Sequence, residues 1–421
     1  MEQAIYFTEK SFRIQPRHAG AMNYSAWLSL LLLGVMIGRV TIAARGREDY
    51  AGIDLAAFVE IIITLLLFGI FYLSPTAHRC IAVYRQSSLK YFFIFLGFGA
   101  ISSFWSVNPA YSAFRAIQDM AILFSVGMIL LDGTSHEIMQ RRFYLIGILV
   151  IVFDVLRKML RFSNYGHVST HDVLLGSSAA ILFGYTLGCF LGKSIDRIGK
   201  IMFVIATIIL LATTSAGASV SVLVGFILVS VLVHKANYLI YLAFFLLVFL
   251  LLYSVFGSEA IKSAIFFGKD EGAIATGSGR TTIWAYYIQM ILKKPILGYG
   301  FAVGSRVCED FYASNSHNTY LGAALGTGLG GVFLLILYFL KSFQSAIESA
   351  KIEKSHGLGL ALGISIIAIN NLTNAYAGES WYTTTVLFSA FAHLLAYQEY
   401  SSRDRKPRRI IIRREMPNAN L

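Results

Sequence analysis

Charged residues are scarce in this sequence. Asp, Glu, Lys and Arg make up 14% of the 421 residues, whereas 56% are hydrophobic and the mean hydropathy is +0.65. One soluble core does not normally hold so much apolar surface, so the composition excludes an ordinary soluble globular protein. It is typical of a chain that crosses a membrane several times.

Cysteine is also scarce, and one arrangement of carboxylates is missing. Cys80, Cys189 and Cys308 are scattered and odd in number, which indicates neither a disulfide framework nor a metal cluster. No Asp-x-Asp pair occurs in the chain. A diphosphate held through a metal ion usually requires such carboxylates, so we expect no metal ion and no other cofactor.

The hydrophobic residues fall into twelve runs of about the length that a membrane-spanning helix needs. The predicted spans are 20–42, 53–73, 91–106, 115–131, 143–161, 173–191, 200–215, 217–233, 238–256, 319–341, 357–375 and 382–398. With both termini inside, the cytoplasmic segments hold 22 of the 35 basic residues and the outer segments 13. Cytoplasmic loops carry the excess of Lys and Arg, so the pattern predicts an all-α, multi-pass membrane protein with both termini in the cytoplasm.

Four parts follow from this arrangement. Residues 1–256 are a membrane bundle of nine helices, 257–318 one large extracytoplasmic loop, 319–398 three further membrane helices, and 399–421 a basic cytoplasmic tail. Long loops in compact proteins are usually functional or disordered, and the aromatic residues of 257–318 favour a folded loop that faces the periplasm. We expect the tail to contact anionic membrane lipids rather than nucleic acid.

The large loop contains a predicted amphipathic helix. Trp284, Tyr287, Ile288 and Ile291 recur at helical spacing and form an apolar stripe, which predicts a helix lying at the membrane–water boundary and ending at Lys293, Lys294 and Pro295. At its start, Gly277, Ser278 and Gly279 precede Arg280. This combination of free N–H groups and a guanidinium is a candidate phosphate site, although a simple turn with a locally paired arginine has the same pattern.

A histidine follows, at the start of the tenth predicted span. His317 and Asn318 come after Ser314, Asn315 and Ser316, all suitable helix-capping residues. A helix N-terminus lowers the pKa of a histidine, and a neutral imidazole accepts a proton. His317 is therefore a candidate general base, the alternative being an ordinary interfacial residue. Glycines recur every fourth residue beyond it, at 322, 326 and 330, and predict close packing against a neighbour.

The predicted outer loop Val155–Gly176 also carries charge. It contains the basic residues Arg157, Lys158 and Arg161, against the usual distribution, and the histidines His167 and His171. Two explanations of this exception stay open. The basic residues bind an anionic ligand, or their side chains reach from helix ends to the membrane surface. We disfavour a metal site at the two histidines because no suitably spaced carboxylate joins them.

Several buried or outer carboxylates remain. Arg115 and Asp119, four residues apart, are most simply an ion pair within the bundle. Asp54 and Glu60 fall in a predicted span and are candidates to line a cavity or a proton path. Glu379 lies in a short outer turn near the predicted cavity.

Four stretches of the sequence resemble a known family. They are SSFWSVNPAYSAFRA (Ser102–Ala116), GHVSTHDVLLG (Gly166–Gly176), SGRTTIW with PILGYG (within Ser278–Gly300), and SHNTYLGAALGTGLGG (Ser316–Gly331). Together with twelve spans and one large outer loop, this pattern resembles the O-antigen ligase and polysaccharide polymerase superfamily of bacterial envelope enzymes. The last two stretches are the most specific.

The resemblance implies a fold of the membrane glycosyltransferase C type and a metal-independent reaction. The donor would be a glycan on undecaprenyl diphosphate, with Arg280 holding the diphosphate and His317 acting as the base. Many members carry a Ser-Arg pair where this chain has Ala216, so Arg157 or Arg161 is expected to replace that arginine. Asn318, His171 and Arg306 complete the predicted substrate-binding set.

The predicted activity is an inverting transfer of the glycan to an acceptor hydroxyl at the outer face of the inner membrane. The acceptor, a lipid A core or a growing carrier-linked polysaccharide, stays open. The alternative function is a polytopic polysaccharide transporter or flippase. Such transporters usually show two similar halves with interrupted helices in matching positions; the sequence contains no such repeat, which favours the enzyme.

Overall fold

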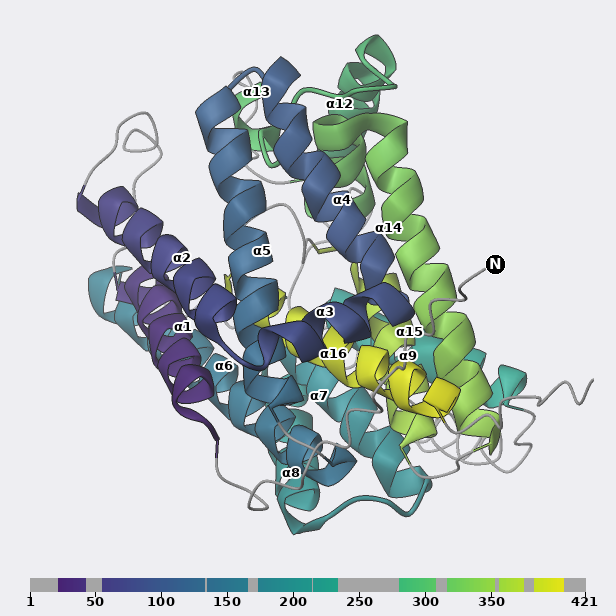
Figure 1. Cartoon of the computed structure of the whole chain (residues 1–421). Coiled ribbons are helices and arrows are strands. Elements are labelled where there is room, and N and C mark those ends of the chain that lie inside the picture. Colours follow the sequence, from purple (N-terminus) through teal and green to yellow (C-terminus); the bar gives the residue numbers. More distant parts are fainter. Residues whose placement is uncertain are drawn as a thin grey trace, which may run out of the picture.

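A computed structural model describes residues 22–42, 55–132, 135–165, 173–213, 215–233, 280–307, 316–352, 356–374 and 382–404. Every regular element in these ranges is helical, which confirms the predicted all-α class. The helices are α1 (Tyr24–Ile42), α2 (Leu55–Leu73), α3 (Ala77–Gln86), α4 (Leu89–Ile101), η2 (Ser102–Trp105), α5 (Pro109–Leu131), α6 (His136–Tyr165), α7 (Val173–Leu191), α8 (Arg197–Ala212), α9 (Ala216–Leu232), α12 (Arg280–Lys293), α13 (Gly304–Val307), α14 (Thr319–Ile352), α15 (Gly357–Asn370) and α16 (Tyr382–Asp404). Figure 1 shows them as one bundle, with α12 and α13 at its upper end.

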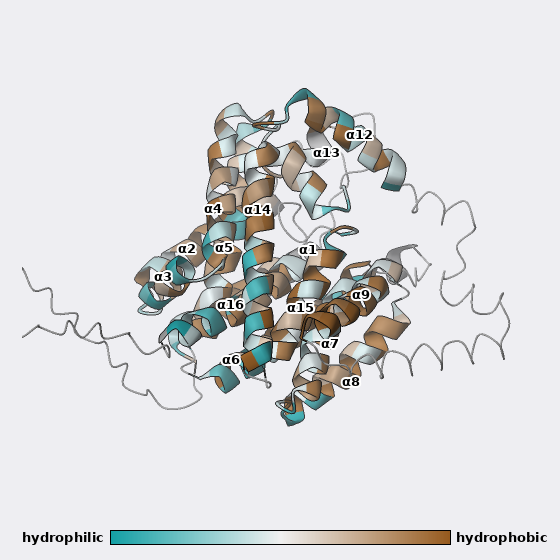
Figure 2. Cartoon of the chain, turned by 90° about the vertical axis from the view of Figure 1, so that its right-hand side faces the viewer, coloured by the Kyte–Doolittle hydropathy of each residue, from teal (hydrophilic) through white to brown (hydrophobic). Residues whose placement is uncertain are grey.

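The predicted apolar runs correspond to helices wherever the structure describes them. Eleven of the twelve ranges coincide with α1, α2, α4, α5 to α9 and α14 to α16, whereas 238–256 lies outside the described residues. In the described part, α5, α7 and α14 are long and apolar enough to cross a membrane, and the bent pair α2 and α3 adds a fourth span if counted as one. Figure 2 shows apolar residues on the outward faces of α8 and α9, where Leu211 is 74% exposed. Twelve crossings remain a prediction.

The helix α3 was not expected from the sequence. It follows α2 after a 90° bend around Pro75 and buries Ala77, Cys80, Val83 and Tyr84, which lie three or four residues apart on one face. Because the opposite face of α3 is polar, the segment contains no long apolar run and was not recognised as a helix. In Figure 1 it crosses the front of the bundle instead of running along it.

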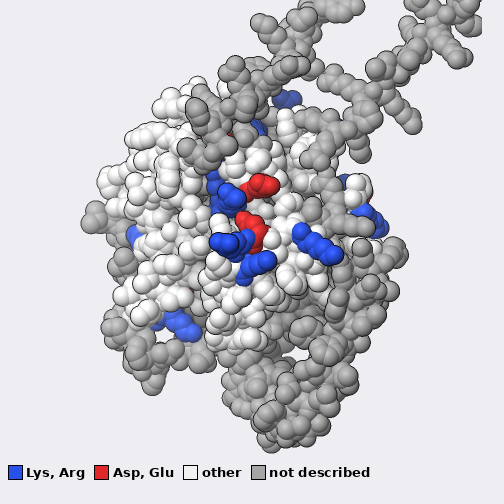
Figure 3. Space-filling view, turned by 90° about the horizontal axis from the view of Figure 1, so that it is seen from below, with Lys and Arg blue, Asp and Glu red and all other residues white. Residues whose placement is uncertain are grey.

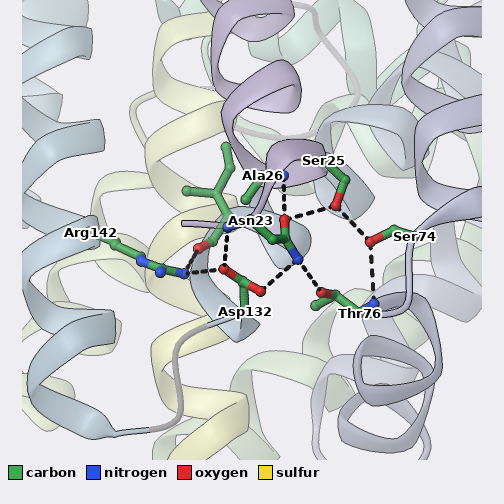
Figure 4. A network of polar contacts seen from close by, with 8 residues as sticks. Asn23, Ser25, Ala26, Ser74, Thr76, Asp132 and Arg142 are labelled. Atoms are coloured by element: carbon green, nitrogen blue, oxygen red, sulfur yellow. Dashed lines mark hydrogen bonds and ion pairs between the residues drawn. The ribbon is translucent and has the colours of Figure 1, made fainter. Parts of the chain in front are cut away.

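One end of the bundle is held by a polar network that joins three segments distant in sequence (Figure 4). The carboxylate of Asp132 accepts hydrogen bonds from the backbone N–H and the side-chain amide of Asn23, at 3.0 and 2.6 Å, and lies 3.3 Å from Arg142. The amide of Asn23 also donates to Thr76 at 3.2 Å. The start of α1, the turn after α2 and the junction between α5 and α6 therefore meet, as expected if successive helices run in opposite directions. We call this the lower end.

The helix α14 differs most from its prediction as a single span. Gly328 has φ 64° and ψ −165°, outside the helical region, so α14 consists of two helical segments. In a straight helix Tyr320 and Phe339 would be about 28 Å apart, yet their ring centroids are 5.9 Å apart. The segment 319–327, called here the half-helix, therefore folds back alongside 329–352, and the expected row of glycines is interrupted at this turn.

Replacing Gly328 by Ala should destabilise the fold by about 2–4 kcal/mol, because the backbone conformation is essentially restricted to glycine and the added Cβ would collide with the carbonyl oxygen of Ile296. The thermal midpoint of the purified protein in detergent, followed by tryptophan fluorescence, measures this change.

The matched control is Gly330→Ala, whose Cβ would meet only the ring of Phe98 at an ordinary 3.5 Å. It should leave the midpoint nearly unchanged. Equal midpoints for the two variants would contradict the turn at Gly328.

Candidate active site

The end of the half-helix is closed by the segment PILGYG. The backbone N–H groups of Tyr299 and Gly300 donate to the carbonyl oxygens of Leu325 and Gly326, both at 2.8 Å. The carbonyls at a helix C-terminus have no partner within the helix, and this loop supplies one. Gly298 has φ 67°, and a Cβ there would lie 2.6 Å from the Gly326 oxygen, so the close approach requires glycine.

A third segment, around the Trp-Ser-x-x-Pro stretch, holds the same loop from its other side. The indole N–H of Trp105 donates to the carbonyl of Leu297 at 2.8 Å, and the N–H of Val107 donates to Tyr299 at 2.9 Å. The hydroxyl of Ser112 donates to the carbonyl of Phe301, also at 2.9 Å. Three of the four stretches that carry the family resemblance therefore meet at one place, although Trp105 of the first stretch lies 192 residues before its partner Leu297.

The helix α12 covers this junction. Tyr287 is buried in a small core with Tyr299, Val303 and Leu325. The predicted end at Lys293 is confirmed, and Arg280 lies in the first described turn. Ile288, four residues after Trp284, is 47% exposed and does not join this core. Contact of the apolar stripe with the membrane boundary stays a prediction.

His317 lies directly before the half-helix in an uncommon conformation. Its φ of 50° falls in the left-handed region, where residues other than glycine are rare and which often marks functional sites. Trp284 of α12 donates its indole N–H to the carbonyl of Ser316 at 2.9 Å. The helix that carries Arg280 is thus bonded to the residue preceding His317.

Asn318 caps the half-helix. Its side-chain oxygen accepts the N–H groups of Tyr320 and Leu321 at 2.9 and 3.0 Å, and its amide donates to the carbonyl of Leu372 at 3.1 Å. Of the expected caps, Ser316 instead bonds the backbone of Asn318, and Ser314 and Asn315 lie outside the described residues. Asn318 therefore fixes the backbone on which His317 sits, and its predicted contact with substrate stays a prediction.

Burial and a neighbouring charge keep His317 neutral. Its pKa is lowered from 6.5 to about 4, mainly because burial disfavours the charged imidazolium and secondly because Arg280 is positive. The direction is the expected one, but the causes are burial and Arg280 rather than the helix terminus. Burial also lowers the pKa of Arg280. The structure thus brings together the two predicted catalytic residues.

A buried polar layer lies next to the start of the half-helix. The N–H of Thr319 donates to the carbonyls of Asn371 and Asn374, at 2.9 and 3.2 Å, and the amide of Asn374 donates to Ser177 at 3.0 Å. These residues were not predicted from the sequence, although asparagines at the end of an apolar run, as in INNLTN (Ile369–Asn374), are the signal that marks them.

Arg157 belongs to a helix and not to a loop. The expected loop from Val155 is wrong in its first part, because α6 continues to Tyr165. Arg157 is buried and lies 3.4 Å from Asp154, whose carboxylate also accepts the hydroxyl of Ser178 at 3.4 Å. Ala216, at the position of the family arginine, is the first residue of α9.

The remaining predicted residues are either outside the description or held by other contacts. Arg161 lies on α6 and Arg306 on α13, but their side chains are outside the described part of the structure. Asp54, His171 and Glu379 lie entirely outside the described residues. Glu60 forms an ion pair with Arg39 of α1, and Arg115 donates to Gln118 at 2.8 Å. Within the described ranges, no three His, Cys, Asp or Glu side chains form a metal-binding group.

Two comparisons with known proteins bear on this site. Residues 201–336, which include Arg280, His317 and the half-helix, match the O-antigen ligase family. The chain is also similar to the exopolysaccharide production protein ExoQ of Rhizobium meliloti (strain 1021), with 24% identity over 303 residues. That alignment covers 63% of this chain and 66% of the relative, so it spans just under two thirds of the relative's length.

Replacing Arg280 by Gln should raise the pKa of His317 above about 4 but leave it below 6.5, because burial remains. Histidine-selective ¹⁵N NMR of the full chain, with the signal assigned from His317→Asn, measures the titration. As pH falls from about 6.5 to about 4, the unfolded chain takes up this proton first, so the wild type should also lose stability over that window.

The control is Lys293→Gln, which removes an exposed charge from the other end of α12 and should leave the titration of His317 unchanged. An identical shift in both variants, or none in Arg280→Gln, would refute the neighbouring charge as a cause.

Proposed function

Because the family match and the relative support membership of the O-antigen ligase and polysaccharide polymerase superfamily, we propose that this chain is an integral membrane glycosyltransferase. It transfers a glycan from undecaprenyl diphosphate to an acceptor hydroxyl during the synthesis of a surface polysaccharide. The observation that carries the proposal is the neutral, buried His317 beside the positive Arg280.

In the proposed reaction, His317 removes the proton of the acceptor hydroxyl as the oxygen attacks the anomeric carbon. The bond from that carbon to the diphosphate oxygen breaks, and the configuration inverts in this single displacement. Arg280 stabilises the negative charge that grows on the departing diphosphate, for which a guanidinium is suited because it contacts two oxygens and stays charged. The proposal assigns no step to a metal ion.

The two residues are matched to these roles by their surroundings. A base must be unprotonated at the operating pH, and a pKa of about 4 leaves His317 neutral at pH 7. No carboxylate in the described part of the chain forms an ion pair with Arg280, so its charge is available to an anionic substrate.

The distribution of basic residues supports a periplasmic site. Seen from below, Figure 3 shows Lys and Arg side chains gathered on the lower end of the bundle. Exposed basic residues here include Arg141, Lys193, Arg197 and Lys200, at the ends of α6, α7 and α8. Cytoplasmic ends usually carry this excess, so we propose that the lower end is cytoplasmic and that the candidate site faces the periplasm.

The acceptor determines whether the enzyme is a ligase or a polymerase. The family name refers to ligation, whereas the relative is named for exopolysaccharide production. Both reactions require the same donor and the same base. We therefore propose the shared transfer chemistry and leave the acceptor to experiment.

Replacing His317 by Ala should lower the transfer rate about 10²–10⁴-fold through loss of the base. Arg280→Ala should lower it about 10²–10³-fold through loss of charge stabilisation. The assay uses purified protein, a radiolabelled undecaprenyl-diphosphate oligosaccharide and a lipid A core acceptor. The control is Lys293→Gln, which removes a positive charge outside the site and should fold and transfer like the wild type.

Label on the core would indicate a ligase, and a ladder of longer carrier-linked glycans would indicate a polymerase. Full turnover by His317→Ala at a normal protein level would refute the proposed base. Movement of the labelled lipid across a vesicle membrane, without any transfer, would instead support the transporter.

A further inference from the structure

A polar cavity lies at the lower end of the bundle, away from the candidate active site. Its volume is about 380 Å³, and it is lined by the turn between α3 and α4, by α14 and by α16. Ser87, Ser88 and Ser345 contribute hydroxyl groups to its wall. Neither the proposed transfer chemistry nor the family match, which ends at residue 336, accounts for it.

Three cations from three different helices face this cavity. Lys90 comes from α4, Lys341 from α14 and Arg403 from α16. In the described ranges, no carboxylate lies within 4.0 Å of any of the three charged groups. Arg403 interacts electrostatically with Glu399 at longer range, and Lys341 donates to the side-chain oxygen of Gln344 at 3.3 Å. With three cations against the two carboxylates Glu348 and Glu399, the wall of the cavity carries a surplus of positive charge.

The two carboxylates of the wall are engaged elsewhere. Glu399 accepts the backbone N–H of Ser88 at 2.5 Å and its hydroxyl at 2.6 Å, so it caps the start of α4. Glu348 accepts the side-chain amide of Gln344 at 3.0 Å. Both are thus bound to protein donors. Ser88 and Ser345 are bonded to Glu399, whereas the Ser87 hydroxyl has no hydrogen-bond partner in the described part of the chain. The Ser87 hydroxyl and the remaining N–H donors of the three cations are therefore the groups proposed to contact a ligand.

An apolar strip begins directly beside the cavity. The helices α4 and α14 lie side by side in both views (Figures 1 and 2), with the rings of Phe92 and Tyr338 5.4 Å apart. Going up from Lys341, the exposed residues of α14 are Leu340, Ile336 and Phe333, at 60%, 42% and 64%. Ile94 of α4, one turn above Lys90, is 49% exposed.

We propose that this cavity binds the phosphodiester headgroup of an anionic phospholipid, with its acyl chains along the exposed strip of α4 and α14. A phosphodiester has one negative charge and oxygen acceptors, which match a guanidinium, two ammonium groups and a hydroxyl donor. Basic pockets between helices on the cytoplasmic side are suited to such headgroups. A free phosphate ester offers the same polar chemistry but leaves the apolar strip uncovered.

The test measures lipid binding by the purified full-length protein with native mass spectrometry, using phosphatidylglycerol, phosphatidylcholine and soluble glycerol phosphate as probes. The wild type should prefer phosphatidylglycerol over phosphatidylcholine. The double variant Lys90→Gln/Lys341→Gln should bind phosphatidylglycerol about 10–30-fold more weakly, because each lysine near the surface contributes to anionic lipid binding.

The matched control is Lys200→Gln/Lys351→Gln, which removes two exposed charges at the same end outside the cavity wall. It should keep the wild-type affinity, and unchanged elution in size-exclusion chromatography verifies folding of both variants. Equal loss in the two double variants, or no preference for phosphatidylglycerol, overturns the proposal. If glycerol phosphate binds as tightly as phosphatidylglycerol, the cavity recognises a free phosphate ester and the proposed lipid ligand is wrong.

Discussion

The site depends on a backbone contact between the loop PILGYG and the C-terminal end of the half-helix, both of which contain glycine. A helix that ends inside an apolar bundle leaves carbonyl groups without water, and each unsatisfied group costs several kcal/mol in such surroundings. The N–H groups of Tyr299 and Gly300 satisfy the carbonyls of Leu325 and Gly326, and this contact allows α14 to turn at Gly328. Without the turn, the residues before α14 would not be folded back against the rest of the helix, and His317 would lie at the end of one long helix instead of at the start of a short one.

The same arrangement couples the position of His317 to its chemistry. Trp284 and Asn318 hold the backbone on both sides of it, so the imidazole is confined to a half-buried place next to Arg280. Confinement removes water from the ring, and removal of water together with the positive neighbour favours the neutral form. A lone histidine on a surface loop would titrate near 6.5. The lowered pKa is thus a consequence of the packing of α12 on the half-helix.

The two ends of the bundle have different polar chemistry. Next to the candidate site, neutral amides and hydroxyls form the polar layer, as in the contacts of Thr319, Asn374 and Ser177. At the lower end, the network around Asp132 fixes the helix junctions, and exposed Lys and Arg surround it (Figure 3). This asymmetry permits one end to meet a diphosphate and the other to contact anionic lipid.

The sequence by itself determined the helical class, the position of every described long apolar helix and the end of α12, because apolar runs and helix-ending residues act over a few positions along the chain. It also singled out Arg280 and His317 as candidates, and their catalytic roles stay a prediction. It did not reveal α3, whose apolar face recurs only every third or fourth residue, nor the turn at Gly328, since a glycine within an apolar run is compatible with both a continuous and a broken helix. Nor did the sequence decide which residues of the α12 stripe pack on the protein, where Tyr287 is buried and Ile288 is exposed, because periodicity does not say which side meets a neighbour. Only the tertiary structure decided that Ser178 donates to Asp154 and that Trp284 reaches Ser316, because these contacts join residues through space, and neither spacing nor composition records which helices pack together.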